Sequence, residues 1–189
     1  MAPNASSSAR VTVASSRKVV LISSGAGIGV LNGFLSTRGR NLSVIVTLAM
    51  MTAIQGITLL VTNGSPIYGF PDALNWLGFA ELPGGVPVSF ATLVVVACAV
   101  AYFLGWTRLG REFYAVGGNP EASRLAGIPV VSRIQLAFVL SGLLSALAGL
   151  ILIGRVASAQ PTGGLGMELN AVGAVLIGGA SLNGGAGRV

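Results

Sequence analysis

Three uncharged apolar runs constrain the fold of this chain more than any other feature. They cover residues 42–61, 88–106 and 134–153. A helix needs about 20 apolar residues to cross the hydrocarbon core of a bilayer, because each residue adds about 1.5 Å along the axis. In lipid, a helix also satisfies its own backbone hydrogen bonds. The sequence therefore predicts an all-α, polytopic membrane protein.

Two weaker segments extend this pattern. Residues 19–35 are rich in small side chains, and residues 169–181 are apolar but shorter than a full span. We expect each of them to span the membrane or to re-enter it, which gives four to five membrane helices in all. A weakly structured, glycine-rich leader is the alternative for residues 19–35.

Small residues recur at four-residue spacing in two of the apolar segments, residues 19–35 and residues 134–153. This spacing places them on one face of a helix. The two sets are Gly25, Gly29 and Gly33, and Ser141, Ser145 and Gly149. Small side chains allow helix backbones to approach closely in a membrane. We therefore expect both faces to pack against other helices.

Composition agrees with a lipid environment. Charged residues make up 8% of the chain and hydrophobic residues 53%, with a mean hydropathy of +0.83, whereas a soluble domain carries about 25% charged residues. The net charge is +6, but the basic residues sit in short loops instead of gathering on one face, which argues against nucleic-acid binding. Residues 1–18 form a polar, basic leader that we expect to lie outside the fold, with residues 19–189 forming the membrane domain.

The arginines predict an orientation. Loops 36–41 and 107–133 carry six arginines between them, while loop 62–87 carries none. Because positive charge accumulates on the cytoplasmic side, we expect the first two loops in the cytoplasm and loops 62–87 and 154–168 outside. The basic leader would then lie outside if residues 19–35 span. We expect either that this segment re-enters the membrane or that helices precede it in the natural protein.

Several kinds of chemistry lack the residues they need. The chain has no histidine, so it offers neither a histidine base nor a histidine metal ligand. Its one lysine is Lys18, in the leader, and no Gly-Lys-Ser/Thr loop is present to cradle phosphate. The three apolar runs contain no Asp, Glu or His, which proton- and ion-coupled carriers commonly place inside the membrane. We expect no catalytic residue, no metal and no cofactor, and an energy source on another chain.

Loop 107–133 contains a short predicted helix. Asn119 suits the N-cap, Pro120 the first turn and Glu121 the positive end of the helix dipole. Gly127 is suited to end the helix, and a proline follows two residues later. A helix of two turns is too short to be stable alone. It either docks into a partner protein or rests on the membrane surface, and the residues alone do not separate these alternatives.

The segment GREFYAVGGNPEASRLAGIPV (110–130) resembles the cytoplasmic coupling loop of ribose-type monosaccharide importer permeases, which are inner-membrane components of binding-protein-dependent ABC transport systems. Glu121-Ala122-Ser123 followed by Gly127 is similar to the importer-permease signature Glu-Ala-Ala-x-x-x-Gly, with Ser at the third position. Residues 47–67 and 154–189 are similar to the same family in the same order, so the resemblance covers roughly residues 25–189. Members of this family are longer, which leads us to expect a chain truncated at both ends, and the leader does not resemble them.

The resemblance implies a permease in the bacterial cytoplasmic membrane that dimerises around a central pathway. A cytoplasmic ATPase and an external or periplasmic sugar-binding protein would be its partners, together with membrane lipid. The implied ATPase-coupling residues are Gly117, Gly118, Asn119, Glu121, Ala122, Arg124 and Gly127. The implied external-face residues are Asn63, Ser65, Gln160, Pro161 and Thr162. The alternatives are a secondary carrier or channel subunit that acts without an ATPase, and a structural membrane subunit.

Overall fold

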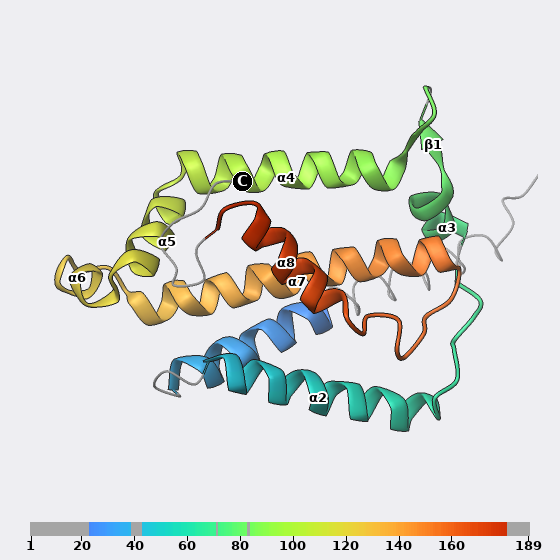
Figure 1. The fold of residues 1–189 in the computed structure, drawn as a ribbon, viewed down its shortest axis with the longest axis horizontal. Helices are drawn as coiled ribbons and strands as arrows, with labels where there is room; N and C mark the ends of the chain where they lie inside the picture. The colour runs from blue at the N-terminus through green and yellow to red at the C-terminus, as the bar shows by residue number, and fades with distance from the viewer. Residues whose placement is uncertain (1–22, 39–42, 71, 83, 181–189) are drawn as a thin grey trace, which may run out of the picture.

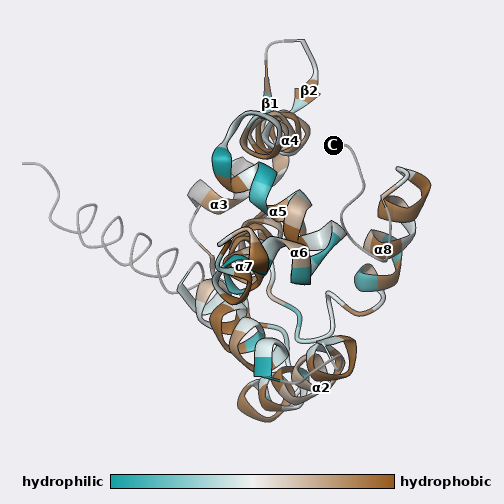
Figure 2. Ribbon diagram, turned by 90° about the vertical axis from the view of Figure 1, so that its left-hand side faces the viewer, coloured by the Kyte–Doolittle hydropathy of each residue, from teal (hydrophilic) through white to brown (hydrophobic). Residues whose placement is uncertain are grey.

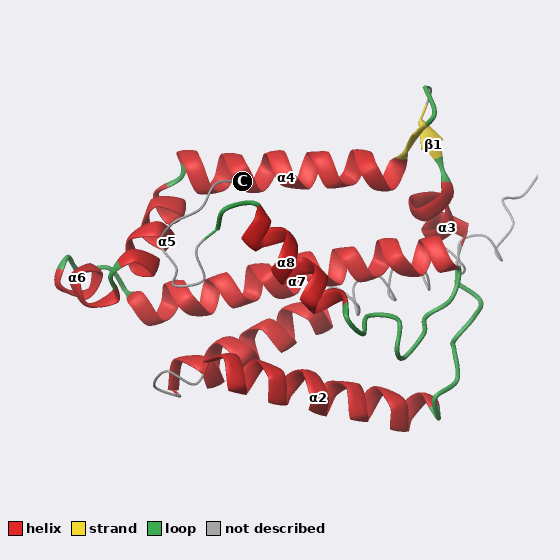
Figure 3. Cartoon of the chain, viewed as in Figure 1, coloured by secondary structure: helices red, strands yellow, loops and turns green. Residues whose placement is uncertain are grey.

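A computed structural model describes residues 23–38, 43–70, 72–82 and 84–180. This part of the chain is mostly helical, with one two-stranded hairpin (Figure 3), and the all-α prediction is confirmed. The elements are a first helix (residues 23–38), α2 (Ser43–Thr62), α3 (Asp72–Phe79), β1 (Glu81–Leu82), β2 (Val86–Pro87), α4 (Val88–Trp106), α5 (Arg108–Gly118), α6 (Pro120–Leu125), α7 (Val130–Val156) and α8 (Met167–Ile177). The predicted leader, residues 1–18, lies outside the described residues.

Helices α2, α4 and α7 are each long and apolar enough to cross a membrane. Their positions confirm the three predicted runs, although α7 is longer than its run at both ends. It begins directly after Pro129 and ends where Ala157 takes a left-handed φ of 54°. Almost none of their residues is fully buried within the chain, so their apolar side chains stay exposed or half-buried. Lipid or neighbouring helices can cover such surfaces, whereas water cannot do so without cost.

The three long helices lie roughly lengthwise beside one another. In Figures 1 and 2, α7 is central, with α4 on one side and α2 on the other. Helices α5 and α6 lie at one end of the bundle, where the first helix finishes and α2 starts (Figure 1). The hairpin and α3 lie at the opposite end. The segments predicted to be cytoplasmic therefore share one end of the bundle, and the segments predicted to be external share the other.

The predicted loop 36–41 is partly wrong, because the first helix continues to residue 38. Thr37 Oγ1 donates to the Gly33 carbonyl at 2.9 Å, which satisfies its hydroxyl inside the helix. The Arg38 guanidinium lies 4.6 Å from the centre of the Phe34 ring, one turn earlier, in the range of a cation–π contact. These local contacts extend the helix past the point where polarity suggested a loop.

The predicted loop 62–87 is also wrong in part, since it contains α3 and the hairpin. Helix α3 packs on the C-terminal part of α7 so closely that a Cβ on Gly78 would lie 2.3 Å from the Gly154 carbonyl carbon. Leu74 is buried at this contact, with 4% of its surface exposed. Eight residues are too few for a stable isolated helix. The tertiary contact with α7 stabilises α3, and no local sequence pattern predicts this contact.

The segment predicted at residues 169–181 forms α8 over Met167–Ile177. Its 11 residues extend about 16 Å at about 1.5 Å each. That length is about half of the hydrocarbon core. Within the described residues, α8 therefore does not span the membrane by itself.

The first helix crosses α7 through small residues. A Cβ on Gly25 would lie 2.6 Å from Ala146 Cβ, and one on Gly29 would lie 2.6 Å from the Phe138 carbonyl oxygen. On α7 the backbone approach is at Gly142, where a Cβ would lie 2.3 Å from the Gly25 carbonyl oxygen.

The small-residue face expected on α7 lies beside this crossing, where Ser141, Ser145 and Gly149 line a hollow together with Gly25 and Gly29 of the first helix. The predicted face was Ser141, Ser145 and Gly149, but Ser141 and Ser145 are exposed and a Cβ on Gly149 would meet no atom within 4 Å. The closest contacts lie one position further along, at Gly142 and Ala146. The sequence did not predict which helices meet at these small residues, and the rotation of α7 about its axis depends on packing.

Candidate functional site

The polar end of the bundle is built from the turn between α4 and α5. Thr107 Oγ1 accepts from the Gly110 N–H at 3.0 Å and donates to the Phe103 carbonyl at 2.6 Å, so one hydroxyl both ends α4 and caps α5. A Cβ on Gly110 would lie 2.2 Å from the Leu104 carbonyl oxygen, so glycine allows the chain to reverse tightly. Helix α5 was not predicted, because the sequence indicated one short helix within a long hydrophilic loop.

Helix α5 is fixed to α7 by an ion pair and to α4 by an aromatic contact. Arg133 Nε, near the start of α7, donates to Glu112 Oε2 of α5. Phe113 of α5 lies against Phe103 of α4, with ring centroids 6.1 Å apart. Both charged side chains of the ion pair are about three-quarters buried, where solvent screens the pair less than at an open surface. The base from which α6 projects is therefore attached to two of the long helices.

Helix α6 forms where the sequence predicts it. Asn119 Oδ1 accepts from the Ala122 N–H at 3.0 Å, and Pro120 occupies the first turn. Gly127 ends the helix with a φ of 81°, a left-handed conformation that glycine adopts without steric cost. Ser123, with 5% of its surface exposed, is the buried residue of α6.

The outward face of α6 combines apolar and charged groups. Leu125 is 90% exposed, and Glu121, Ala122 and Arg124 are exposed beside it. Figure 2, which looks onto this end, shows α6 as a hydrophilic element next to the apolar long helices. A groove of about 380 Å³ runs between α6 and the start of α7, lined by Arg124, Ile128 and Val131 among others. A projecting leucine beside charged side chains leaves apolar surface in water, and contact with a partner protein or with the membrane surface would remove it from water.

The structure places all the sequence-predicted coupling residues in this one region. Gly117 and Gly118 end α5, Asn119 separates α5 from α6, and the remaining four lie on α6 or just after it. Leu125 was not among the predicted residues. The signal that could have identified it is an isolated leucine in a short polar helix that has little apolar surface to bury it against.

The predicted external-face residues lie together at the opposite end. The Ile67 N–H donates to the Ala159 carbonyl at 3.0 Å and the Ala159 N–H donates back at 2.9 Å, which joins the loop after α2 to the loop after α7. Asn63 and Ser65 precede this bridge, and residues 160–162 follow it. These five residues are exposed or half-buried. The bridge is a long-range contact that the sequence did not predict.

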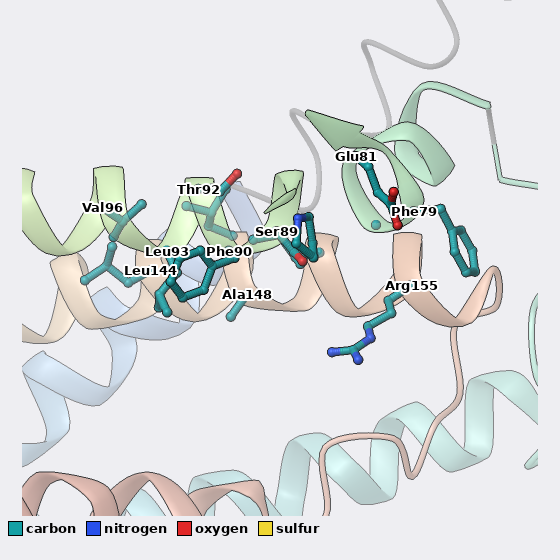
Figure 4. Close-up of a pocket in the computed structure, with 14 residues that line it drawn as sticks. Phe79, Glu81, Ser89, Phe90, Thr92, Leu93, Val96, Leu144, Ala148 and Arg155 are labelled. Atoms are coloured by element: carbon teal, nitrogen blue, oxygen red, sulfur yellow. The ribbon is translucent and has the colours of Figure 1, made fainter. Parts of the chain in front are cut away.

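Several cavities lie along the bundle, and two of them differ in their lining. The larger, of about 830 Å³, lies between α4 and α7 and is lined mainly by apolar side chains such as Phe90, Leu93 and Leu144 (Figure 4). The smaller, of about 400 Å³, lies between the first helix, α2 and the segment that leads into α8. We call the smaller one the polar cavity, because Asn32, Gln55 and Glu168 line it. The described residues contain no group of three or more His, Cys, Asp or Glu side chains that could hold a metal ion.

Long helices with outward apolar surfaces, and polar connections gathered at the two ends of the bundle, define an integral membrane protein of the polytopic α-helical class. The chain belongs to the family described as "Branched-chain amino acid transport system / permease component", which matches residues 18–186. The resemblance to importer permeases is thereby confirmed. The family and the three long apolar helices together place the chain in the bacterial cytoplasmic membrane.

Several curated proteins that are similar in sequence to this chain are named as sugar permeases. Over 169 aligned residues, this chain is 46% identical to the ribose import permease protein of Escherichia coli strain K12. The aligned residues make up 87% of this chain and 52% of the relative. The ribose import permease protein of Bacillus subtilis strain 168 is 44% identical over 84% of this chain and 49% of its own length. The L-arabinose transport system permease protein of E. coli K12 is 38% identical over 84% of this chain and 48% of its own length. The chain thus spans about half the length of these relatives. No solved structure matches it significantly.

Proposed function

We propose that the chain is the membrane-spanning permease subunit of an ATP-binding-cassette importer for a ribose-like monosaccharide. The observation that carries the proposal is α6, a capped helix that exposes 90% of Leu125 together with the charged side chains of Glu121 and Arg124. The chain lacks a phosphate-binding Gly-Lys-Ser/Thr loop. A separate ATPase that docks on α6 would supply the energy for transport.

The relatives support a sugar as the transported solute. Those at 46%, 44% and 38% identity are named for ribose or L-arabinose, although the family description names branched-chain amino acids. A solute-binding protein would meet the opposite end, where Asn63, Ser65 and residues 160–162 are joined by the Ile67–Ala159 bridge. The exposed apolar surfaces of α2 and α8 would be covered by a second permease subunit or by lipid.

Docking on α6 is tested by replacing Leu125 with serine. The substitution removes the exposed apolar side chain without disturbing a buried core, so we expect the ATPase to be lost from the purified complex while the permease stays in the membrane. Leu82→Ser is the matched control, because Leu82 is also an exposed leucine but lies in β1, at the other end of the bundle. Retention of the ATPase by the Leu125→Ser variant would contradict the proposal.

The alternative is a carrier or channel that needs no ATPase. It is distinguished by measuring uptake into membrane vesicles loaded with ATP and into vesicles given only an ion gradient. We expect uptake only with ATP. The described spanning helices α2, α4 and α7 contain no Asp, Glu or His, whereas ion-coupled carriers commonly use such residues. Uptake driven by the ion gradient alone would favour the carrier.

A further inference from the structure

Helices α4 and α7 stand apart along most of their length. Helix α3 contacts both of them at one end, and α5 contacts both of them at the other end. Between these ends, the described residues of α4 and α7 make almost no close backbone approach to one another. The spacing of the two long helices is therefore set by short helices at their ends, and not by packing of α4 against α7.

Two cavities occupy the space between α4 and α7 and join to form one groove. The first, of about 830 Å³, lies toward α3 (Figure 4), and the second, of about 730 Å³, lies toward α5. Val96 of α4 and Leu144 of α7 line both cavities, and we call the two together the α4–α7 groove. The groove follows α4, whose 19 residues extend about 28 Å. That length matches the hydrocarbon core of a bilayer, which is about 30 Å thick.

The walls of the groove are apolar and accessible. Phe90 and Leu93 of α4 are 56% and 62% exposed, and Leu144 of α7 is 41% exposed. A spanning helix is about 10–12 Å wide with its side chains, and its connections would have to pass α3 and α5, which lie across the two ends of the groove (Figure 1). Acyl chains are thinner, are flexible and can enter from the side. The groove therefore suits lipid chains better than it suits another helix.

Two charges without a partner lie at the α3 end of the groove. Arg155, in the last turn of α7, and Glu81, in β1, both line it. Both are exposed, and neither forms an ion pair with another described residue. Trp76 of α3, at the same end, is 61% exposed, and tryptophan is enriched where a membrane meets water. This end of the groove therefore suits the level of the lipid headgroups.

We infer that the α4–α7 groove binds a zwitterionic phospholipid of the phosphatidylethanolamine type, with its acyl chains between the two helices and its headgroup at the α3 end. The guanidinium of Arg155 suits the phosphate, and the carboxylate of Glu81 suits the ammonium group. An anionic headgroup, such as that of phosphatidylglycerol, would meet the like charge of Glu81 without an ammonium group to offset it. The bound lipid would cover apolar surface that α4 and α7 do not cover for each other. The inference goes beyond the proposed function, because it does not depend on the solute that is carried.

Occupancy of the groove is tested by filling it with tryptophan. Val96→Trp places a large side chain where the two cavities join, whereas Val95 is 67% exposed and lines neither cavity, so Val95→Trp is the matched control. The phospholipid that each variant retains after purification in detergent is counted by native mass spectrometry. We expect Val96→Trp to retain one phosphatidylethanolamine fewer per chain than the parent, and Val95→Trp to retain as many as the parent. Equal retention by all three proteins would overturn the inference.

The same mass spectra distinguish a lipid from a protein in the groove. If Val96→Trp lost a second copy of the chain instead of a lipid, the groove would be a subunit interface and the inference would be wrong. Neither result depends on transport, so the proposed function stands or fails separately.

The headgroup contacts are tested by variants that leave the apolar walls intact. We compare the rise in melting temperature that added phosphatidylethanolamine or phosphatidylglycerol gives in detergent. We expect phosphatidylethanolamine to stabilise the parent more, Glu81→Gln to lose this preference, and Arg155→Gln to be stabilised less by both lipids, since both carry a phosphate. Glu121→Gln, at the opposite end of the bundle, removes an exposed glutamate and should keep the preference of the parent. An unchanged preference in Glu81→Gln would refute the headgroup assignment, even if Val96→Trp did not fold.

Discussion

Replacing Gly127 with valine tests whether the backbone conformation at the end of α6 is needed for function. The substitution strains the backbone but causes no steric clash. Gly127 has a φ of 81°, and a Cβ there would meet no atom within 4 Å. The cost is therefore conformational, about 1–2 kcal/mol for an ordinary residue in the left-handed region. A change of that size alters an equilibrium by about 5- to 30-fold.

The strain acts on the two hydrogen bonds that close the end of α6. The Gly127 N–H donates to the Arg124 carbonyl and the Ile128 N–H to the Ser123 carbonyl, both at 3.0 Å. We expect hydrogen–deuterium exchange of the amides of residues 122–128 to be about 5- to 30-fold faster in Gly127→Val. Ribose uptake should fall, because the docking surface is formed less often. Membrane abundance should not change, because the long apolar helices are untouched.

Two further variants make this prediction refutable. Gly127→Asn should behave close to the parent, since asparagine tolerates the left-handed conformation better than other residues. Gly105→Val is the control for adding a β-branched side chain, because Gly105 lies in α4 with open space around it and no positive φ. If Gly127→Val exchanged no faster than the parent, or if asparagine were as harmful as valine, backbone conformation would not be what position 127 contributes.

Two shorter predictions concern packing and orientation. Gly29→Ala would bring a Cβ within 2.6 Å of a backbone carbonyl oxygen of α7, so we expect a lower melting temperature in detergent, from about 1–3 kcal/mol of overpacking; Gly27→Ala, with no atom within 4 Å, should melt like the parent. In a Cys98→Ala background, an impermeant thiol reagent should label Ser65→Cys on intact cells and Glu121→Cys only after the membrane is opened, because the arginine-rich end should face the cytoplasm. The reverse pattern would invert the topology.

Local chemistry was predictable where short-range interactions decide the structure. The apolar run at residues 88–106 has the same bounds as α4, because the boundary of a spanning helix follows the change in polarity. Asn119, Pro120 and Gly127 predicted the start and end of α6, since capping and left-handed termination involve only neighbouring residues. The roles assigned to the coupling and external-face residues stay predictions until the experiments above are carried out.

Elements that depend on distant partners were missed. Helix α3 is stabilised by Gly78 against Gly154, whose positions differ by 76 in the sequence. Helix α5 depends on the ion pair between Glu112 and Arg133 and on its capping by Thr107. Each is short, so its intrinsic helix propensity is not enough to reveal it.

The sequence by itself determined that this chain is a helical membrane protein with its arginines concentrated at one end of the bundle. Lipid solvates only apolar surface, and a chain within it must pair its own backbone polar groups. A chain meets both requirements with apolar runs long enough to form spanning helices, which can be recognised from the sequence alone. The tertiary structure alone decided which face of each helix is used. The close backbone approach at Gly142, and the meeting of Asn32 and Gln55 at one cavity, depend on how whole helices rotate against one another. Rotation about a helix axis is set by close packing of many side chains at once, and no single segment carries that information.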